Sequence, residues 1–165
     1  MKTKTALFLG RFQPFHLGHL WVAKTLSKIH DEVVIIIGTH QKGKARNPFT
    51  FSERKKMIRM VLKKAGIENY RIKSIPDYPS DAEWIRKIKK ISPKGAVMFS
   101  GNDYIINLFR KNKLPVKRIK IYKGISADKV RRLIRQNKNW EKYVDNVIGS
   151  FLKKNKLLKK VRKHP

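Results

Sequence analysis

A run of five β-branched residues at positions 33–37 limits the fold of this chain more than any other feature. Such a run is typical of a strand buried on both faces, as in a parallel sheet that helices cover on each side. The segment before it carries Leu20, Ala23, Leu26 and Ile29 at helical spacing. A buried strand that follows an amphipathic helix predicts an α/β protein.

Strand and helix patterns alternate along the rest of the chain. The predicted strands are residues 5–9, 33–37, 71–75, 96–99 and 118–122. Strands separated by helices form a parallel sheet with right-handed crossovers. We therefore expect a Rossmann-like, doubly wound, five-stranded parallel sheet with C-terminal helices. Its ligand should bind beyond the carboxyl ends of the strands.

The length of the chain predicts a single domain, residues 1–165. Residues 140–165 combine apolar positions with many lysines, and we expect them to form a basic helical tail packed on that domain. The Ser/Thr-x-x-Glu pattern of a capping box occurs at residues 50–53 and 80–83 and predicts two helix starts. Gly66 is expected to close the first of these helices.

Lysine and arginine number 41 against 11 aspartates and glutamates, a formal net charge of +30. A field of this sign attracts polyanions, so we expect non-specific nucleic-acid binding. A general surface bias explains the same numbers, because the basic residues are spread along the whole chain. The chain has no cysteine, which excludes disulfides and thiolate metal sites.

No apolar run is long enough to span a membrane, and the N-terminus lacks the pattern of a signal peptide. We therefore expect a cytoplasmic protein without a membrane partner. The sequence leaves homo-oligomer formation open, since self-repulsion at this charge has to be screened at any subunit interface.

The turn after the first predicted strand carries two imidazoles, His16 and His19, and the guanidinium of Arg11. The first free N–H groups of the following helix favour an anion there. Gly10 and Gly18 are expected to let a ligand approach closely. This turn therefore predicts a polyphosphate cradle.

Two other interpretations of His16 and His19 compete with the phosphate cradle. They could be a metal pair, but the chain has no Cys, no His-Glu-x-x-His spacing and no obvious third ligand. They could also be ordinary turn histidines. Two imidazoles, one arginine and two glycines in one strand-to-helix turn count against that interpretation.

A second turn of the same kind follows the last predicted strand. It leads through Ser126 into a predicted helix that carries Arg131 and Arg132. An exposed basic helix is the alternative. Because both turns leave the carboxyl ends of strands, we expect them to converge on one nucleotide.

Residues 38–45 have the glycine and lysine spacing of a P-loop, but the last position is Ala45, where Mg²⁺ binding needs a hydroxyl. Pro48 also disfavours a helix start at this point. We expect instead a mobile basic loop near the phosphates, with Lys44 or Arg46 contributing a positive charge.

The motif Gly-Arg-Phe-Gln-Pro-Phe-His-x-Gly-His at residues 10–19 resembles the archaeal-type nicotinamide-nucleotide adenylyltransferases of the nucleotidyltransferase superfamily. Residues 47–54, Ser100-Gly101-Asn102 and residues 126–132 are similar to further segments of that family. The resemblance covers most of the chain. It implies the nucleotidyltransferase fold and transfer of AMP from MgATP to nicotinamide mononucleotide (NMN), which gives NAD and pyrophosphate.

The resemblance also implies roles for individual residues. His16 and His19 would hold the ATP phosphates, His19 would stabilise the transition state, and Arg11 and Arg131 would contact phosphates. Trp84 would face the nicotinamide ring and Asn102 would lie in the dinucleotide pocket. Mg²⁺ would be bound mainly through the ATP phosphates, without a protein metal site. The other implied ATP-binding residues are Gly10, Phe12, Gly18, Lys44, Arg46, Ser126 and Arg132.

Two positions depart from the family pattern. Asp128 stands where the family usually has Thr, and Asp81 where we expect Asn, in a loop between Pro76 and Trp84 that is shorter than usual. Two alternatives therefore stay open. One is adenylyl or cytidylyl transfer to another small phosphate, such as phosphopantetheine or FMN. The other is a nucleic-acid-associated binding protein with a degenerate nucleotide site.

Overall fold

The computed structural model describes residues 3–38, 46–120 and 124–163. The chain divides into two compact units, and each is built from three separate segments. The first unit comprises residues 1–10, 22–39 and 69–121. The second unit comprises residues 11–21, 40–68 and 122–165.

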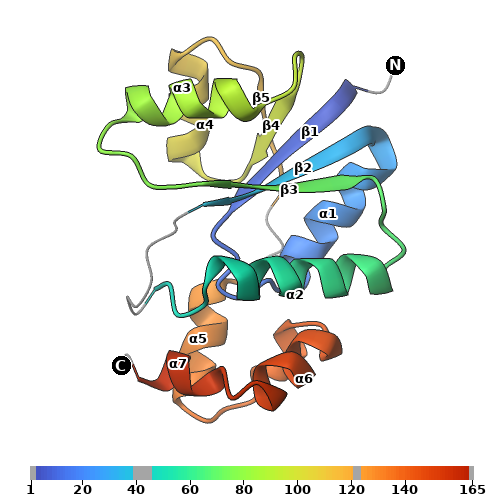
Figure 1. The fold of residues 1–165 in the computed structure, drawn as a ribbon, viewed down its shortest axis with the longest axis vertical. Coiled ribbons are helices and arrows are strands. Elements are labelled where there is room, and N and C mark those ends of the chain that lie inside the picture. The colour runs from blue at the N-terminus through green and yellow to red at the C-terminus, as the bar shows by residue number, and fades with distance from the viewer. Residues whose placement is uncertain (1–2, 39–45, 121–123, 164–165) are drawn as a thin grey trace. The chain divides into compact units, whose positions relative to one another are not determined.

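Within the described residues, the first unit holds one sheet of five parallel strands in the order β3-β2-β1-β4-β5 (Figure 1). This confirms the predicted doubly wound sheet. The strand order changes direction between β1 and β4, which are the first strands of the two halves of the sheet. The strands are β1 (Thr3–Gly10), β2 (His30–Gly38), β3 (Tyr70–Ile75), β4 (Val97–Ser100) and β5 (Val116–Arg118).

Helices α3 (Asp81–Ile91) and α4 (Asp103–Lys111) cover one face of this sheet (Figure 1). The part of α1 (Leu17–Ile29) that belongs to the first unit lies on the other face (Figure 1). Burial on both faces explains the β-branched run of β2, whose residues 33–37 are each at most 1% exposed. The core beneath α3 and α4 includes Leu7, Val34, Ile36, Met98, Ile85, Ile88 and Phe109.

The prediction for the last strand, residues 118–122, is wrong. β5 begins at Val116 and ends at Arg118, and residues 121–122 lie outside the described residues. Among the described residues β5 pairs with β4 alone, in a register that joins Val116 to Met98 and Arg118 to Ser100. β4 ends at Ser100, and the described ladder of hydrogen bonds ends with Ile119 N–H to Ser100 O.

The second unit consists of helices and loops. It contains α2 (Phe51–Lys64), α5 (Ala127–Arg135), the short helix η1 (Glu141–Tyr143), α6 (Asn146–Lys154) and α7 (Leu158–Arg162). In this unit α6 packs on α2 and α7 packs on α5. Helices are therefore present in the tail, as predicted, whereas a single domain over residues 1–165 stays a prediction.

The capping signals read from the sequence are present around α2. The Thr50 hydroxyl accepts from Glu53 N–H at 3.2 Å, and the Glu53 carboxylate accepts from Thr50 N–H at 2.8 Å. Gly66, with φ +66°, follows the last turn in the left-handed conformation that closes helices. At the second capping box only one of the two bonds is described, from Glu83 N–H to Ser80 Oγ.

Helix length and hydropathy give no candidate for a membrane-spanning helix within the described ranges.

Candidate active site

Helix α1 begins at Leu17, three residues before the predicted start at Leu20, because two histidines cap it. The His16 carbonyl accepts the first helical hydrogen bond, from Leu20 N–H at 3.1 Å. His16 Nδ1 accepts from His19 N–H at 3.3 Å, and His19 Nδ1 accepts from His16 N–H at 3.2 Å. The imidazoles thus form a reciprocal capping box, in which they replace the usual hydroxyl and carboxylate.

These hydrogen bonds determine the protonation state of both rings. An Nδ1 that accepts a backbone hydrogen bond carries no proton, so each neutral ring carries its proton on Nε2. Burial lowers the pKa of His16 from 6.5 to about 4. Burial also lowers the pKa of His19 well below 6.5, and the neighbouring His16 lowers it further. At neutral pH the two residues are therefore uncharged hydrogen-bond donors.

Phenylalanines pack against the histidine pair. The two imidazoles stack with centroids 3.6 Å apart. The ring of Phe12 meets His19 edge-on at 4.9 Å, and Phe15 lies 5.4 Å from it. Both phenylalanines are 1% exposed. Phe12 is thus a packing residue of the turn, and its backbone has a φ of +53°, a conformation that costs a non-glycine residue about 1–2 kcal/mol.

Gln13 connects the histidine turn to two other parts of the second unit. Its side chain is buried and exchanges two hydrogen bonds with the backbone of Phe49, each of 2.9 Å. Its carbonyl accepts from Arg131 Nη1 at 2.7 Å. Arg54, also buried, donates from Nη1 to the carbonyl of Arg11 at 2.8 Å. Gln13 and Arg54 were not among the predicted site residues, although both stand in the motifs that carry the resemblance.

Arg131 is a buried cation, 2% exposed, on α5. Burial lowers the pKa of its guanidinium, Asp128 opposes this by raising it, and Arg11, Arg135 and Arg46 lower it further. The structure therefore brings three predicted phosphate contacts, Arg11, Arg46 and Arg131, within electrostatic range of one another. Such a concentration of positive charge favours a polyanionic ligand.

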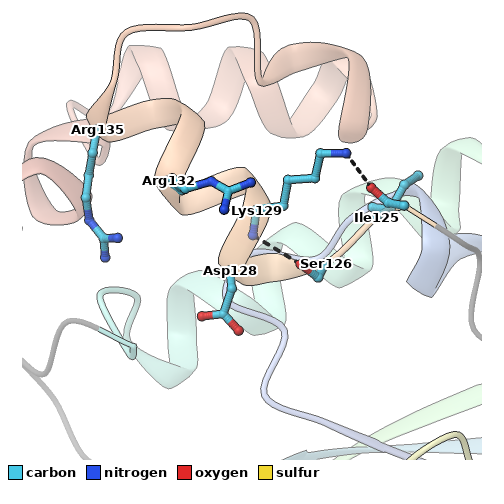
Figure 2. Close-up of a pocket in the computed structure, with 7 residues that line it drawn as sticks. Ile125, Ser126, Asp128, Lys129, Arg132 and Arg135 are labelled. Atoms are coloured by element: carbon cyan, nitrogen blue, oxygen red, sulfur yellow. Dashed lines mark hydrogen bonds between the residues drawn. The ribbon is translucent and has the colours of Figure 1, made fainter.

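The N-terminus of α5 opens onto a cavity of about 560 Å³ (Figure 2). Ser126 caps the helix, because its hydroxyl accepts from Lys129 N–H at 3.1 Å. The Lys129 ammonium donates to the Gly124 carbonyl at 2.8 Å. Of the predicted residues, Ser126 and Arg132 line this cavity; Lys129 and Arg135 line it as well and were not predicted.

The remaining predicted ATP-binding residues have different positions. Gly10 ends β1 in the first unit, and Gly18 lies in the first turn of α1. Arg46 is exposed. The next residue, Asn47, is buried, and the oxygen of the Asn47 side chain has no hydrogen-bond partner within the described ranges. The expectation for Lys44 concerns a residue outside the described residues.

The predicted acceptor residues Trp84 and Asn102 belong to the first unit. Trp84 is half-buried on α3, packs against the core and meets the ring of Phe109 edge-on at 6.3 Å. Asn102 is exposed and caps α4 by accepting from Tyr104 N–H at 2.9 Å. The Tyr104 hydroxyl in turn donates to Asp81, the first residue of α3.

In the parts of the chain that the structure describes, no group of three or more His, Asp or Glu side chains is arranged to hold a metal ion. Neutral Nε2–H donors and guanidinium groups suit phosphate oxygens instead. The protein is thus of the α/β class, and its donor set suits a polyphosphate next to a helix N-terminus.

Comparison with known proteins shows which family has this fold and these motifs. A family model described as cytidylyltransferase-like matches residues 7–143. The chain is 36% identical to the nicotinamide-nucleotide adenylyltransferase of Methanolobus tindarius, over 86% of this chain and 83% of that protein. It is 35% identical to the protein of the same name from Pyrobaculum neutrophilum, over 91% of this chain and 88% of the relative. The chain therefore belongs to the cytidylyltransferase-like family.

A solved structure shows the same fold. It is a bifunctional NMN adenylyltransferase/ADP ribose pyrophosphatase from Francisella tularensis, crystallised with AMP and an Mn ion. The TM-score is 0.78 at 24% identity, and the match covers 98% of this chain and 52% of that protein. The chain thus spans about half the length of the bifunctional protein. This likeness, like the family model, confirms the predicted nucleotidyltransferase fold.

The burial of His16 predicts an acid-sensitive fold. Unfolded His16 takes up a proton near pH 6.5, but folded His16 only near pH 4. As the pH falls from 6.5 to 4, protonation therefore favours the unfolded chain, and the free energy of unfolding falls by up to about 3 kcal/mol. Urea denaturation at several pH values, with His16→Asn as comparison, measures this loss. An equal pH dependence in the two proteins would contradict it.

Gln13→Ala is expected to lower the free energy of unfolding by about 2–4 kcal/mol, because it leaves two buried backbone groups of Phe49 without partners. Gln136→Ala removes an exposed glutamine from the same unit and is the matched control, with an expected change below about 0.5 kcal/mol. Chemical denaturation compares the two variants. Similar losses in both would show that the Gln13 hydrogen bonds contribute little.

Proposed function

We propose that this chain transfers the adenylyl group of ATP to nicotinamide mononucleotide and releases pyrophosphate. The observation that carries the proposal is the stacked histidine pair, joined through Gln13 to Arg131, which offers donors for a polyphosphate. The name shared by the curated relatives supports the choice of acceptor. Their identity to this chain extends over 86% and 91% of its length.

The reaction needs no nucleophilic side chain. A phosphate oxygen of NMN, already ionised at neutral pH, attacks the α-phosphorus of ATP. A new P–O bond forms as the bond from the α-phosphorus to the oxygen that bridges to the β-phosphorus breaks, and pyrophosphate leaves with the electron pair. Catalysis then consists of alignment and of stabilising charge on the transferred and leaving phosphates.

Each group of the candidate site has a role in this scheme. His16 and His19 donate hydrogen bonds from Nε2–H to phosphate oxygens, and His19 stabilises the transition state. Arg11, Arg46 and Arg131 neutralise charge on the triphosphate. The N-terminus of α5 offers a further anion site near Ser126 and Arg132. Lys44, Gly10, Phe12 and Gly18 complete the proposed set, with Phe12 acting by packing against His19.

Mg²⁺ would be bound mainly through the ATP phosphates, because the described donor set is cationic or neutral and lacks a carboxylate cluster. When bound, a divalent ion neutralises charge on the triphosphate. The Mn ion and AMP of the solved bifunctional structure support a divalent ion and an adenine nucleotide.

On the acceptor side, Trp84 is proposed to contact the nicotinamide ring, which is a pyridinium cation in NMN. The face of a tryptophan attracts such a cation. Asn102, at the N-terminus of α4, is proposed to contact the dinucleotide. A cytoplasmic location, non-specific nucleic-acid binding through the +30 charge and homo-oligomer formation stay predictions.

An activity assay tests the proposal. Purified protein with ATP, Mg²⁺ and NMN is expected to form NAD. His19→Ala is expected to lower kcat by a factor on the order of 10² or more, because a donor to the transition state is lost. Thermal unfolding of the variant checks that it folds. ATP binding without NAD formation would show that the proposed acceptor is wrong.

Trp84→Ala is expected to raise KM for NMN by a factor on the order of 10 and to leave KM for ATP unchanged, because the contact with the pyridinium ring is lost. Thermal unfolding of the variant measures the separate loss of packing against the core. Trp21→Ala, which removes an exposed tryptophan of α1, is the matched control. Steady-state kinetics with each substrate varied in turn separates the two constants. Equal changes in both KM values would point to a general loss of structure and contradict the assignment.

A further inference from the structure

The guanidinium of Arg131 has a mixed set of partners. Nη1 donates to the Gln13 carbonyl at 2.7 Å, and Nη2 forms an ion pair with the carboxylate of Asp128. Nε is buried, and no hydrogen-bond partner for it is found among the described residues. The Gln13 carbonyl and the Asp128 carboxylate therefore hold the guanidinium on two sides, and its Nε–H has no hydrogen-bond partner among the described residues.

Asp128 is far more exposed than its partner. Its side chain is 69% exposed, against 3% for that of Arg131, and it lies one helical turn before Arg131 on α5. It also lines the cavity at the N-terminus of α5 (Figure 2). The carboxylate thus reaches a buried guanidinium from the solvent side. Because the exposed carboxylate is well solvated once it leaves the ion pair, a competing anion displaces it easily.

The surroundings of this ion pair are strongly positive. Arg11, Arg46 and Arg135 all act on Arg131 as like charges, and among the described residues Asp128 is the group that acts on it with the opposite sign. Because Asp128 lines the cavity and pairs with the buried Arg131, an anion that contacts this guanidinium from the cavity has to displace the carboxylate. Ligand and carboxylate therefore compete for Arg131.

We propose that Asp128 is a positioning residue: its carboxylate is the partner of Arg131 until the triphosphate binds, and the phosphates then displace it. This inference rests on the proposed function, which makes Arg131 a phosphate contact. Before binding, Asp128 keeps the guanidinium oriented and partly neutralised. After binding, its displaced carboxylate lies close to the phosphates and repels them, so it weakens ATP binding and promotes release of pyrophosphate.

The test measures the binding of MgATP and of inorganic pyrophosphate by calorimetry at fixed ionic strength, without any acceptor. Asp128→Asn removes the charge and retains the shape of the side chain. It is expected to bind both ligands tighter by a factor on the order of 10, because one like charge within a few ångströms of the phosphates is lost. In the assay, inhibition by pyrophosphate should strengthen by a similar factor while KM for ATP falls.

Glu141→Gln is the matched control. Glu141 is an exposed acid of the same unit that pairs with Lys153, so its removal changes the net charge by the same amount. Its affinities should stay within about twofold of the wild type, since exposed charges at a distance are screened. Asp128→Ser is a second variant, for which the same gain is expected, and thermal unfolding checks each protein.

Weaker or unchanged binding in both Asp128 variants would overturn the inference; weaker binding would show that the carboxylate helps to hold the ligand. An equal gain in Glu141→Gln would also overturn it, because net charge alone would then explain the effect. These results do not depend on NMN. Tighter binding in the Asp128 variants without NAD formation supports the inference and contradicts only the proposed acceptor.

Discussion

The two hydrogen bonds that His16 and His19 exchange determine the character of the whole candidate site. They begin α1, hold the rings face to face and leave the proton of each ring on Nε2. Two charged imidazoles at a separation of 3.6 Å would repel each other, so the arrangement requires neutral rings. The apolar rings of Phe12 and Phe15, which pack against His19, favour that neutral state. The cap of α1, the burial of the rings and their protonation state thus all depend on the same turn.

Gln13 extends this arrangement from one turn to the rest of the second unit. Its side chain binds the backbone before α2 and its carbonyl binds Arg131 on α5, so the three segments that carry the basic groups share one residue. Arg54 adds a second link through the carbonyl of Arg11. Electrostatic repulsion among Arg11, Arg46, Arg131 and Arg135 opposes this assembly. Buried hydrogen bonds to backbone groups offset it.

The sheet could be predicted from the sequence because a strand buried on both faces leaves an unmistakable apolar run, as residues 33–37 do. The limits of β5 could not, because the partner strand sets the length of an edge strand. The start of α1 was missed because histidine is not among the usual capping residues. The roles of Gln13 and Arg54 depend on contacts 36, 43 and 118 residues apart along the chain, which no local pattern encodes.

The order in which the segments of the two units follow one another along the chain affects how the protein folds and how it can be divided into fragments. Segments of the first and second units alternate, and each unit needs three of them. No single cut of the polypeptide therefore separates the two units, and no contiguous fragment contains one whole unit without segments of the other. Each unit also has to close loops formed by segments of the other before its own contacts can form. The same connecting segments therefore constrain both the assembly of the sheet and the assembly of the histidine turn.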